Sequence, residues 1–255
     1  MAAYDFTATR LFVGEPLAGE ARIAISGDRA NYLLNVLRLR DGAAILVFNG
    51  RDGEWRATLT ETTRRATVLR IDACTRAQTS GPDIDYCFAP LKHARLDYIV
   101  QKAVEMGARR LCPVVTQRTQ VSRVNGERMR ANAIEAAEQC GILAVPDVVD
   151  AQPLDRFLAG RDPARLLVLC DEDAPLADPV AALRTAPPAT GFSLLIGPEG
   201  GFDPQERNAL LAQPATIRLS LGPRILRADT AGVAALTLLQ AIRGDWKSPD
   251  TFSPR

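Results

Sequence analysis

Histidine and paired cysteines are scarce in this 255-residue chain, and each scarcity excludes a class of site. His93 is the only histidine, so a multi-imidazole metal site and a pair of imidazole bases are excluded. The five cysteines are an odd number without a CxxC pair, which argues against a disulfide framework and a zinc site. We therefore expect no metal, and we interpret His93 as a surface or interface residue rather than a general base.

Long apolar runs are also absent. No stretch approaches the roughly 20 apolar residues that span a bilayer, and the start MAAYDFTATR lacks a basic segment followed by an apolar one. We expect a cytoplasmic protein without a membrane partner. With 47% hydrophobic and 24% charged residues, the composition is typical of a packed globular chain and excludes disorder.

The net charge of +1 hides an uneven distribution of charge along the chain. Within residues 92–130, nine basic residues accompany only three acidic ones, Asp97, Glu105 and Glu127. Such an excess predicts either a surface that faces phosphates or an ordinary solvated helix face.

Residues 1–73 have the pattern of a small β-rich domain. One helix is predicted near 28–38, and Gly50 to Gly53 reads as a hairpin loop. Short runs rich in β-branched and apolar residues predict the strands, at 10–13, 22–25, 43–49, and in EWRATLT and RRATVLRI. The polar stretch 74–83, with its Ser-Gly-Pro turn signal, predicts a linker.

From residue 84 to 247, strands alternate with helices, which predicts an α/β domain with a mostly parallel sheet. RLLVLC and FSLLIG are short apolar runs typical of buried strands. The segment Asp203-Pro204-Gln205-Glu206 has a capping residue, a first-turn proline and a reciprocal glutamate, so a helix should begin there. Residues 248–255 are predicted to be a frayed, flexible tail.

Two loops follow apolar strands and precede helices. GPEGGF spans 197–202, and LSLGPRILRADTA spans 219–231. Ligands of open α/β sheets bind where strands end, and glycines allow close approach of the backbone. The second loop offers an apolar slot with a charged rim, which fits an adenosine-bearing ligand beside a polyanion. Its structural alternative is an N-cap at Asp229 or Thr230 with Arg227 as an ion-pair partner.

Together with KHARLDYIVQKAVEMGARRLCPVVTQRT and EAAEQCG, these loops resemble the RsmE family of SPOUT-class methyltransferases. The resemblance extends to RLFV and NYLLNVLRLRDGAAILVFNG near the N-terminus, and thus covers most of the chain. It implies a PUA-like, β-barrel RNA-binding domain followed by a parallel sheet threaded into a trefoil knot, against the rule that chains do not knot. It also implies a homodimer.

The activity implied by the resemblance is methyl transfer from S-adenosylmethionine (SAM) to N3 of a uridine in the 16S rRNA of the small ribosomal subunit. SAM should be held by the loop after RLLVLC and by the two glycine-bearing loops. The residues expected to bind it are Ile196, Gly197, Glu199, Gly200, Leu219, Leu221, Gly222, Ile225 and Leu226.

Uridine N3 carries a proton between two carbonyl groups, so a nucleophile must form as that proton leaves. We expect Arg227 or Arg224 to stabilise the charge on the carbonyl oxygens, and Asp229 to accept the proton or orient Arg227. Phosphate contacts are expected from six basic residues, Arg10, Arg38, Arg40, Lys92, Arg118 and Arg123.

The sequence departs from the family pattern at three places. Asp229 stands where a Thr-Glu-Thr helix start has glutamate, Ile142 replaces an arginine, and Gln117 replaces an acidic residue. Three alternatives remain open at this point. They are ribose 2′-O methylation, a ribosome assembly factor without catalysis, and a nucleotide-dependent dehydrogenase, which the missing GxGxxG fingerprint disfavours.

Overall fold

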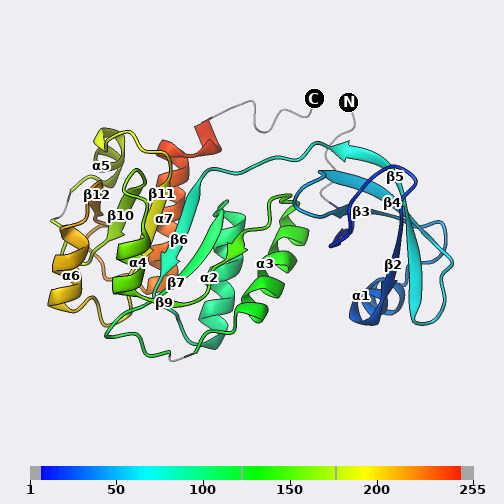
Figure 1. Ribbon diagram of the computed structural model, residues 1–255, viewed down its shortest axis with the longest axis horizontal. Coiled ribbons are helices and arrows are strands. Elements are labelled where there is room, and N and C mark those ends of the chain that lie inside the picture. The colour runs from blue at the N-terminus through cyan, green and yellow to red at the C-terminus, as the bar shows by residue number, and fades with distance from the viewer. Residues whose placement is uncertain (1–6, 122, 176, 248–255) are drawn as a thin grey trace. The chain divides into compact units, whose positions relative to one another are not determined.

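A computed structural model describes residues 7–121, 123–175 and 177–247 (Figure 1). The predicted tail at 248–255 lies outside the described residues. The chain divides into two compact units. The N-terminal unit runs up to Ser80 and includes Ala137–Val145, and the C-terminal unit contains Gly81–Ala136 and the chain from Pro146 onward. Among the described residues, no helix combines the length and apolar character that crossing a membrane requires.

The N-terminal unit is a five-stranded sheet in the order β1-β3-β4-β5-β2. All neighbouring strands are antiparallel except β1 and β3. Alternate residues of the strands point inward, so Ile23, Ile25, Leu69 and Ile71 lie in one buried core. The strands are β1 (Arg10–Phe12), β2 (Arg22–Ser26), β3 (Ala44–Phe48), β4 (Glu54–Thr60) and β5 (Ala66–Arg76).

The small β-rich domain expected at the N-terminus is present as a half-barrel, in which no pairing among the described residues joins the edge strands β1 and β2. One feature of this unit corrects the sequence predictions. The expected linker begins too early, because β5 continues to Arg76 and pairs there with Glu54.

The predicted helix of this unit has two parts. It begins as α1 (Gly27–Asn31) and continues as a π-helical turn, η1 (Tyr32–Val36), closed by the bond from the Leu37 N–H to the Tyr32 carbonyl at 2.9 Å. Leu33 and Leu34 are buried against the sheet, which explains why the apolar pattern predicted a helix but not its winding.

A buried ion-pair network ties the start of the chain to β4 and β5. The Arg10 Nε donates to Glu54 at 3.0 Å, and both side chains are almost fully buried. Arg76 donates to the same carboxylate and to the carbonyl oxygen of Gly141. Burial alone would raise the pKa of Glu54, but the hydrogen bonds and charge of Arg76, with Thr75 and Arg10, lower it overall. The prediction that Arg10 contacts RNA phosphate is therefore wrong.

The C-terminal unit has a parallel sheet in the order β12-β10-β11-β6-β7-β8, with β9 pairing with β7. Every pair of neighbouring strands is parallel, as the alternating pattern predicted. The strands are β6 (Ile84–Phe88), β7 (Arg110–Val115), β8 (Asp147–Val148), β9 (Gln152–Pro153), β10 (Leu166–Cys170), β11 (Phe192–Ile196) and β12 (Thr216–Leu219).

Helices cover both faces of this sheet (Figure 1). Cys87, Leu167 and Leu195 face a core formed with α4 and α6, whereas Tyr86 faces α2 and α7 across Gly232. The helices are α2 (His93–Glu105), α3 (Gly126–Cys140), α4 (Leu154–Gly160), α5 (Pro179–Thr185), α6 (Pro204–Leu211) and α7 (Ala228–Arg243), followed by the 3-10 turn η2 (Asp245–Lys247).

The start of α6 confirms the local sequence signal. Asp203 is the N-cap, its carboxylate accepts the Gln205 N–H at 2.9 Å, and the Glu206 side chain accepts the Asp203 N–H. This capping box fixes the direction in which the chain leaves the loop after β11.

Candidate active site

Four neighbouring strands of the C-terminal unit end at the same edge of the sheet. Cys170 of β10 is in register with Ile196 of β11 and Leu219 of β12, and Ile196 is in register with Phe88 of β6. The loops after β11 and β12 therefore flank the loop after β10. The structure brings together the three loops that sequence analysis selected, at the edge where parallel sheets bind ligands.

The loop after β11, residues 197–202, is braced from several sides. The Gly201 N–H donates to the Pro198 carbonyl at 2.9 Å, and Gly201 has a φ of 68°, a conformation that glycine adopts readily. A side chain at Gly201 would collide with the carboxylate of Glu172 from the loop after β10. Arg118 donates to the Gly200 carbonyl at 2.7 Å, and Arg95 forms an ion pair with Glu199.

The loop after β10 is fixed by a carboxylate that sequence analysis missed. Asp171 is buried and accepts hydrogen bonds from Arg207 of α6 at 3.1 Å and from Arg218 of β12 at 3.0 Å. Arg207 also pairs with Asp173 at 2.5 Å. An arginine in the middle of the apolar strand ATIRLSL is the sequence signal that could have revealed this network, because a charge there needs a buried partner.

The loop after β12 is open in contrast. Within the described part of the chain, the backbone N–H and C=O groups of 221–226 form no hydrogen bonds with other residues. Gly222 has a φ of 96° and faces open space, and the Ile225 side chain is 99% exposed. Free backbone groups beside apolar side chains suit the adenine and ribose of SAM, so the residues present fit this cofactor.

The start of α7 differs from the structural alternative considered for it. Arg227 is the N-cap and provides no side-chain cap, and Asp229 lies in the first turn, where its carboxylate accepts the Thr230 N–H at 2.9 Å. Among the ion pairs of the described residues, none includes Arg224 or Arg227, and both side chains are exposed. The two arginines and Asp229 are therefore close together in the chain without neutralising one another.

Two titratable groups lie beneath these loops. Burial raises the pKa of Cys170 to about 12, with Asp171 adding to the shift, so its thiol is neutral at physiological pH. Burial also raises the pKa of Tyr86 well above its usual range, with smaller contributions from Cys170, Cys87 and Asp229. Neither group can serve as a base at neutral pH.

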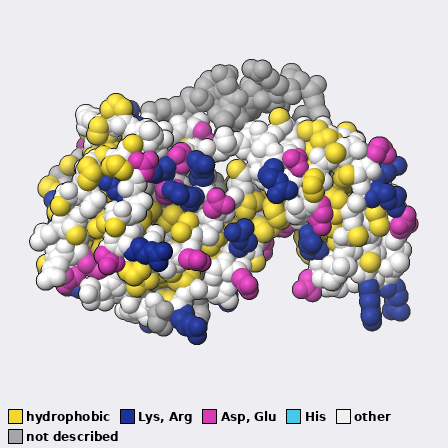
Figure 2. Space-filling view, in the orientation of Figure 1, with side chains coloured by type: hydrophobic (Ala, Val, Ile, Leu, Met, Phe, Trp, Pro, Cys, Tyr) yellow, Lys and Arg dark blue, Asp and Glu magenta, His cyan; other side chains and the backbone are white. Residues whose placement is uncertain are grey.

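The basic surface predicted over 92–130 is largely neutralised. Five of its nine basic residues form ion pairs with Glu199, Glu105, Asp83, Asp85 and Asp97. Figure 2 shows basic and acidic side chains interspersed on the visible face. Lys92 and Arg118 line a small hollow with Pro90, Pro198 and Glu199 beside the loop after β11.

The remaining predicted phosphate contacts are exposed, as such contacts require. Arg38 and Arg123 are exposed, and the Arg40 guanidinium donates to the carbonyl groups of Leu34 and Leu39. The side chain of His93 lies outside the part that the structure describes.

Residues 79–240 match the protein family described as "RNA methyltransferase domain", and residues 25–72 match "RNA methyltransferase PUA domain". The first match covers most of the chain, including all three loops at the sheet edge. The chain belongs to this RNA methyltransferase family.

Within this family, the chain is similar to methyltransferases named for the RNA of the small ribosomal subunit. The chain is 26% identical to the ribosomal RNA small subunit methyltransferase E of Rickettsia conorii, over 91% of this chain and 95% of the relative. It is 30% identical to the enzyme of the same name from Synechocystis, over 92% of this chain and 78% of the relative.

Two solved structures carry the cofactor. The ribosomal RNA small subunit methyltransferase E of Neisseria gonorrhoeae, bound to S-adenosyl methionine, is 26% identical with a TM-score of 0.82, covering 94% of this chain and 99% of that one. A methyltransferase of Legionella pneumophila in complex with SAM is 28% identical with a TM-score of 0.81, covering 93% and 99%.

Proposed function

We propose that this protein transfers the methyl group of SAM to N3 of one uridine in the 16S rRNA of the small ribosomal subunit. The observation that carries the proposal is the shared sheet edge, where two glycine-bearing loops flank the loop after β10. The SAM-bound relatives and the names of the small subunit methyltransferases support it.

The cofactor would lie against the open loop after β12. Backbone groups of 219–226 would bind the adenosine part, with Leu221, Ile225 and Leu226 as apolar walls. Ile196, Gly197, Glu199 and Gly200 would line the opposite side. When bound, the sulfonium of SAM supplies an activated methyl group, so the protein contributes alignment and proton removal.

The start of α7 would act on the uracil. Arg227 or Arg224 stabilises negative charge on the two carbonyl oxygens as the N3 proton leaves. Asp229 accepts that proton or orients Arg227. Both arginines are available for this role, since no ion pair among the described residues neutralises them.

Substrate RNA would be held by exposed cations outside this loop. Lys92, Arg118 and Arg123 belong to the C-terminal unit, and Arg38 and Arg40 to the N-terminal unit. Each phosphate contact makes binding weaker as salt rises. A homodimer, a trefoil knot and a cytoplasmic location complete the proposal, following the resemblance to the RsmE family.

Mass spectrometry of small-subunit RNA tests the proposal directly. RNA from cells lacking this protein should gain one methylated uridine after incubation with the protein and SAM, and the methyl group should reside on the base at N3. A methyl group on the ribose 2′-oxygen would support the alternative SPOUT reaction. No incorporation, despite SAM binding, would contradict the proposal.

A further inference from the structure

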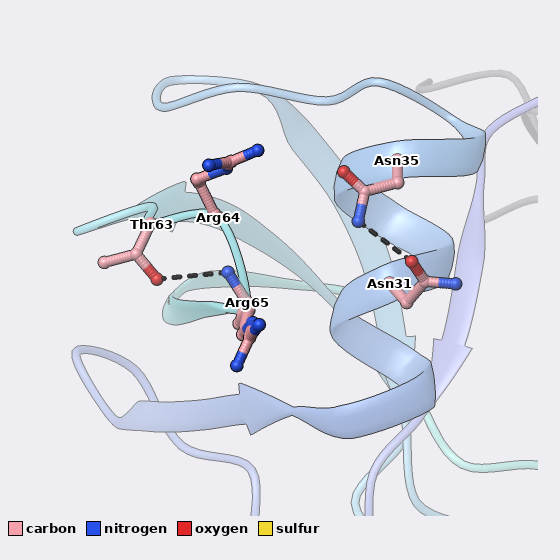
Figure 3. A pocket seen from close by; sticks show the side chains of 5 residues that line it. All are labelled: Asn31, Asn35, Thr63, Arg64 and Arg65. Atoms are coloured by element: carbon pink, nitrogen blue, oxygen red, sulfur yellow. Dashed lines mark hydrogen bonds between the residues drawn. The ribbon is translucent and has the colours of Figure 1, made fainter.

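A cavity lies in the N-terminal unit, whereas the loops that would bind SAM belong to the C-terminal unit. It is open, has a volume of about 700 Å³, and is lined by Asn31 and Asn35 on one side and by Thr63, Arg64 and Arg65 on the other (Figure 3). This volume is within the range of roughly 300–1,000 Å³ that small ligands occupy. The residues that line it are all of polar type, and Arg64 and Arg65 are the charged ones among them.

Arg64 and Arg65 lie on a turn whose backbone is fixed by hydrogen bonds, and neither forms an ion pair among the described residues. The Thr63 hydroxyl accepts the Ala66 N–H at 3.1 Å and donates to the Ala66 carbonyl, which fixes the turn between β4 and β5. Arg64 and Arg65 at this turn are exposed, and no ion pair among the described residues includes them. Two adjacent like charges repel each other, so the arrangement favours binding of an anion.

Two acidic residues close to the turn in sequence have partners of their own. Glu61, which precedes the turn, forms an ion pair with Arg22. The carboxylate of Asp41 accepts the Thr62 N–H at 2.9 Å. A hydrogen bond from the Thr62 side chain and this backbone hydrogen bond together lower the pKa of Asp41. Neither of these two carboxylates therefore pairs with Arg64 or Arg65.

The opposite wall provides a hydrogen-bonding edge. The Asn35 side-chain nitrogen donates to the Asn31 side-chain oxygen at 2.9 Å. This bond uses one of the two N–H groups of Asn35 and leaves the other, together with Oδ1, unused by the described residues. In Figure 3 the Asn35 carboxamide lies on the side of the helix that faces the turn. A carboxamide with a free donor and a free acceptor pairs with the N6 and N7 atoms of adenine.

The helix that carries these asparagines is unusual in two ways. Its second turn is π-helical. Such turns are rare in proteins, and many of those that occur are at functional sites. The same turn exposes Tyr32 and Val36, which are the large hydrophobic side chains that the described part of the N-terminal unit presents to solvent.

We propose that this cavity binds one unpaired nucleotide of the RNA substrate, with adenine preferred. Arg64 and Arg65 bind the flanking phosphates, and the Asn35 carboxamide recognises the base. An RNA segment is favoured over a protein partner because the lining residues are two arginines without an ion pair among the described residues, two asparagines and a threonine. This inference rests on the proposed RNA substrate, and it gives the N-terminal unit a base preference beyond electrostatic attraction.

The test uses the full chain and fluorescence anisotropy with a labelled oligouridine strand, either uniform or carrying one central adenine. The wild type should bind the adenine-containing strand about tenfold more tightly, as expected for one bidentate base contact. Replacing Asn35→Ala should abolish this preference and leave the salt dependence of binding unchanged, because the amide carries no charge.

The arginines have a separate signature. R64A/R65A should weaken binding of both strands at least tenfold and reduce the slope of log affinity against log salt by about 1.4, at about 0.7 for each lost phosphate contact. R64K/R65K retains the charge and should restore the slope. The matched control R51A/R56A removes two exposed arginines elsewhere in this unit and should change the affinity less than threefold. Thermal unfolding of each variant checks that it is folded.

Equal losses in R64A/R65A and R51A/R56A would overturn the inference, since binding would then follow net charge alone. It would also fall if the wild type showed no preference for adenine, or if the variants lost affinity only for assembled subunits, which would indicate a ribosomal protein. The assay contains no SAM and no methyl transfer. The proposal for the cavity can therefore be refuted while the proposal of uridine methylation holds, and uridine methylation can be refuted while the proposal for the cavity holds.

Discussion

At the scale of single residues, the start of α7 concentrates the chemistry. Asp229 lies in the first turn of the helix, next to the N-cap Arg227, and it does not cap the helix. Its carboxylate accepts the Thr230 N–H, and its charge favours the positive end of the helix, so the position also stabilises α7. A role toward substrate is therefore decided by methyl transfer in variants of this residue.

Replacing Asp229→Asn tests that role. We expect methyl transfer to fall about a hundredfold, because general base catalysis contributes roughly 10²–10⁴ in rate. The affinity for SAM, measured by calorimetry, should stay unchanged. Asp229→Glu keeps the carboxylate and should retain most activity. Near wild-type methyl transfer by the asparagine variant would rule out the base.

Residue-scale predictions failed where a partner lies far away in the sequence. Arg10 looked like a surface cation, yet its partner Glu54 is 44 residues away and buries it. Arg118 stays a predicted RNA contact, and its hydrogen bond to the Gly200 carbonyl, 82 residues away, was not foreseen. The neighbouring sequence indicates what a charged side chain can do chemically. It does not indicate which group, distant in the sequence, forms an ion pair or hydrogen bond with it.

At the scale of elements, local signals were read correctly. The capping box of α6 and the buried strands β10 and β11 follow from residues adjacent in the chain. The winding of η1 could not be predicted, because buried residues at Leu33 and Leu34 fit an α-helix as well as a π-helical turn.

The network around Asp171 holds two elements to the loop after β10, and its removal should act on cofactor binding. In Asp171→Asn, Arg207 and Arg218 lose their shared charge. We expect a loss of about 3 kcal/mol in unfolding free energy, as for breaking a buried pair. The KM for SAM should rise about tenfold while kcat at saturating SAM is retained.

Asp173→Asn is the matched comparison for Asp171. Its carboxylate is 66% exposed and pairs only with Arg207 among the ion pairs of the described residues, so both effects should be smaller. If kcat fell in Asp171→Asn and the KM for SAM did not change, the loop-positioning role would be wrong.

The ion pairs of Glu54 link strands β1, β4 and β5, and they predict a pH dependence of stability. The pKa of Glu54 is lowered in the folded state, so its contribution is present above the unfolded pKa of about 4.5 and is lost as the pH falls below it. Glu54→Gln should lower the unfolding free energy by about 3–5 kcal/mol at pH 7 in urea denaturation.

The difference between this variant and the wild type should shrink in denaturation at more acidic pH, where Glu54 itself becomes protonated. Glu61→Gln is the control, because Glu61 forms an exposed pair with Arg22 and should change stability by less than about 1 kcal/mol. A pH-independent difference between Glu54→Gln and wild type would contradict the linkage.

At the scale of the whole molecule, the division into two units was predicted and its boundary was not. Residues 137–145 belong to the N-terminal unit, although they follow most of α3 in the chain. Glu138 accepts the Phe12 N–H at 2.8 Å, and the Gly141 carbonyl accepts a hydrogen bond from Arg76. Contacts between segments this far apart in the sequence have no local sequence signal. The alternation of strands and helices is a local signal, and it predicted the parallel sheet.

The central claim is that the loops after β11 and β12 together bind SAM. A crystal structure of this protein with SAM tests it most directly. We predict that the adenosine part contacts the backbone of residues 219–226, with Ile196 to Gly200 on the other side and the methyl group directed toward Arg227 and Asp229. SAM bound at any other place in the chain would contradict the account.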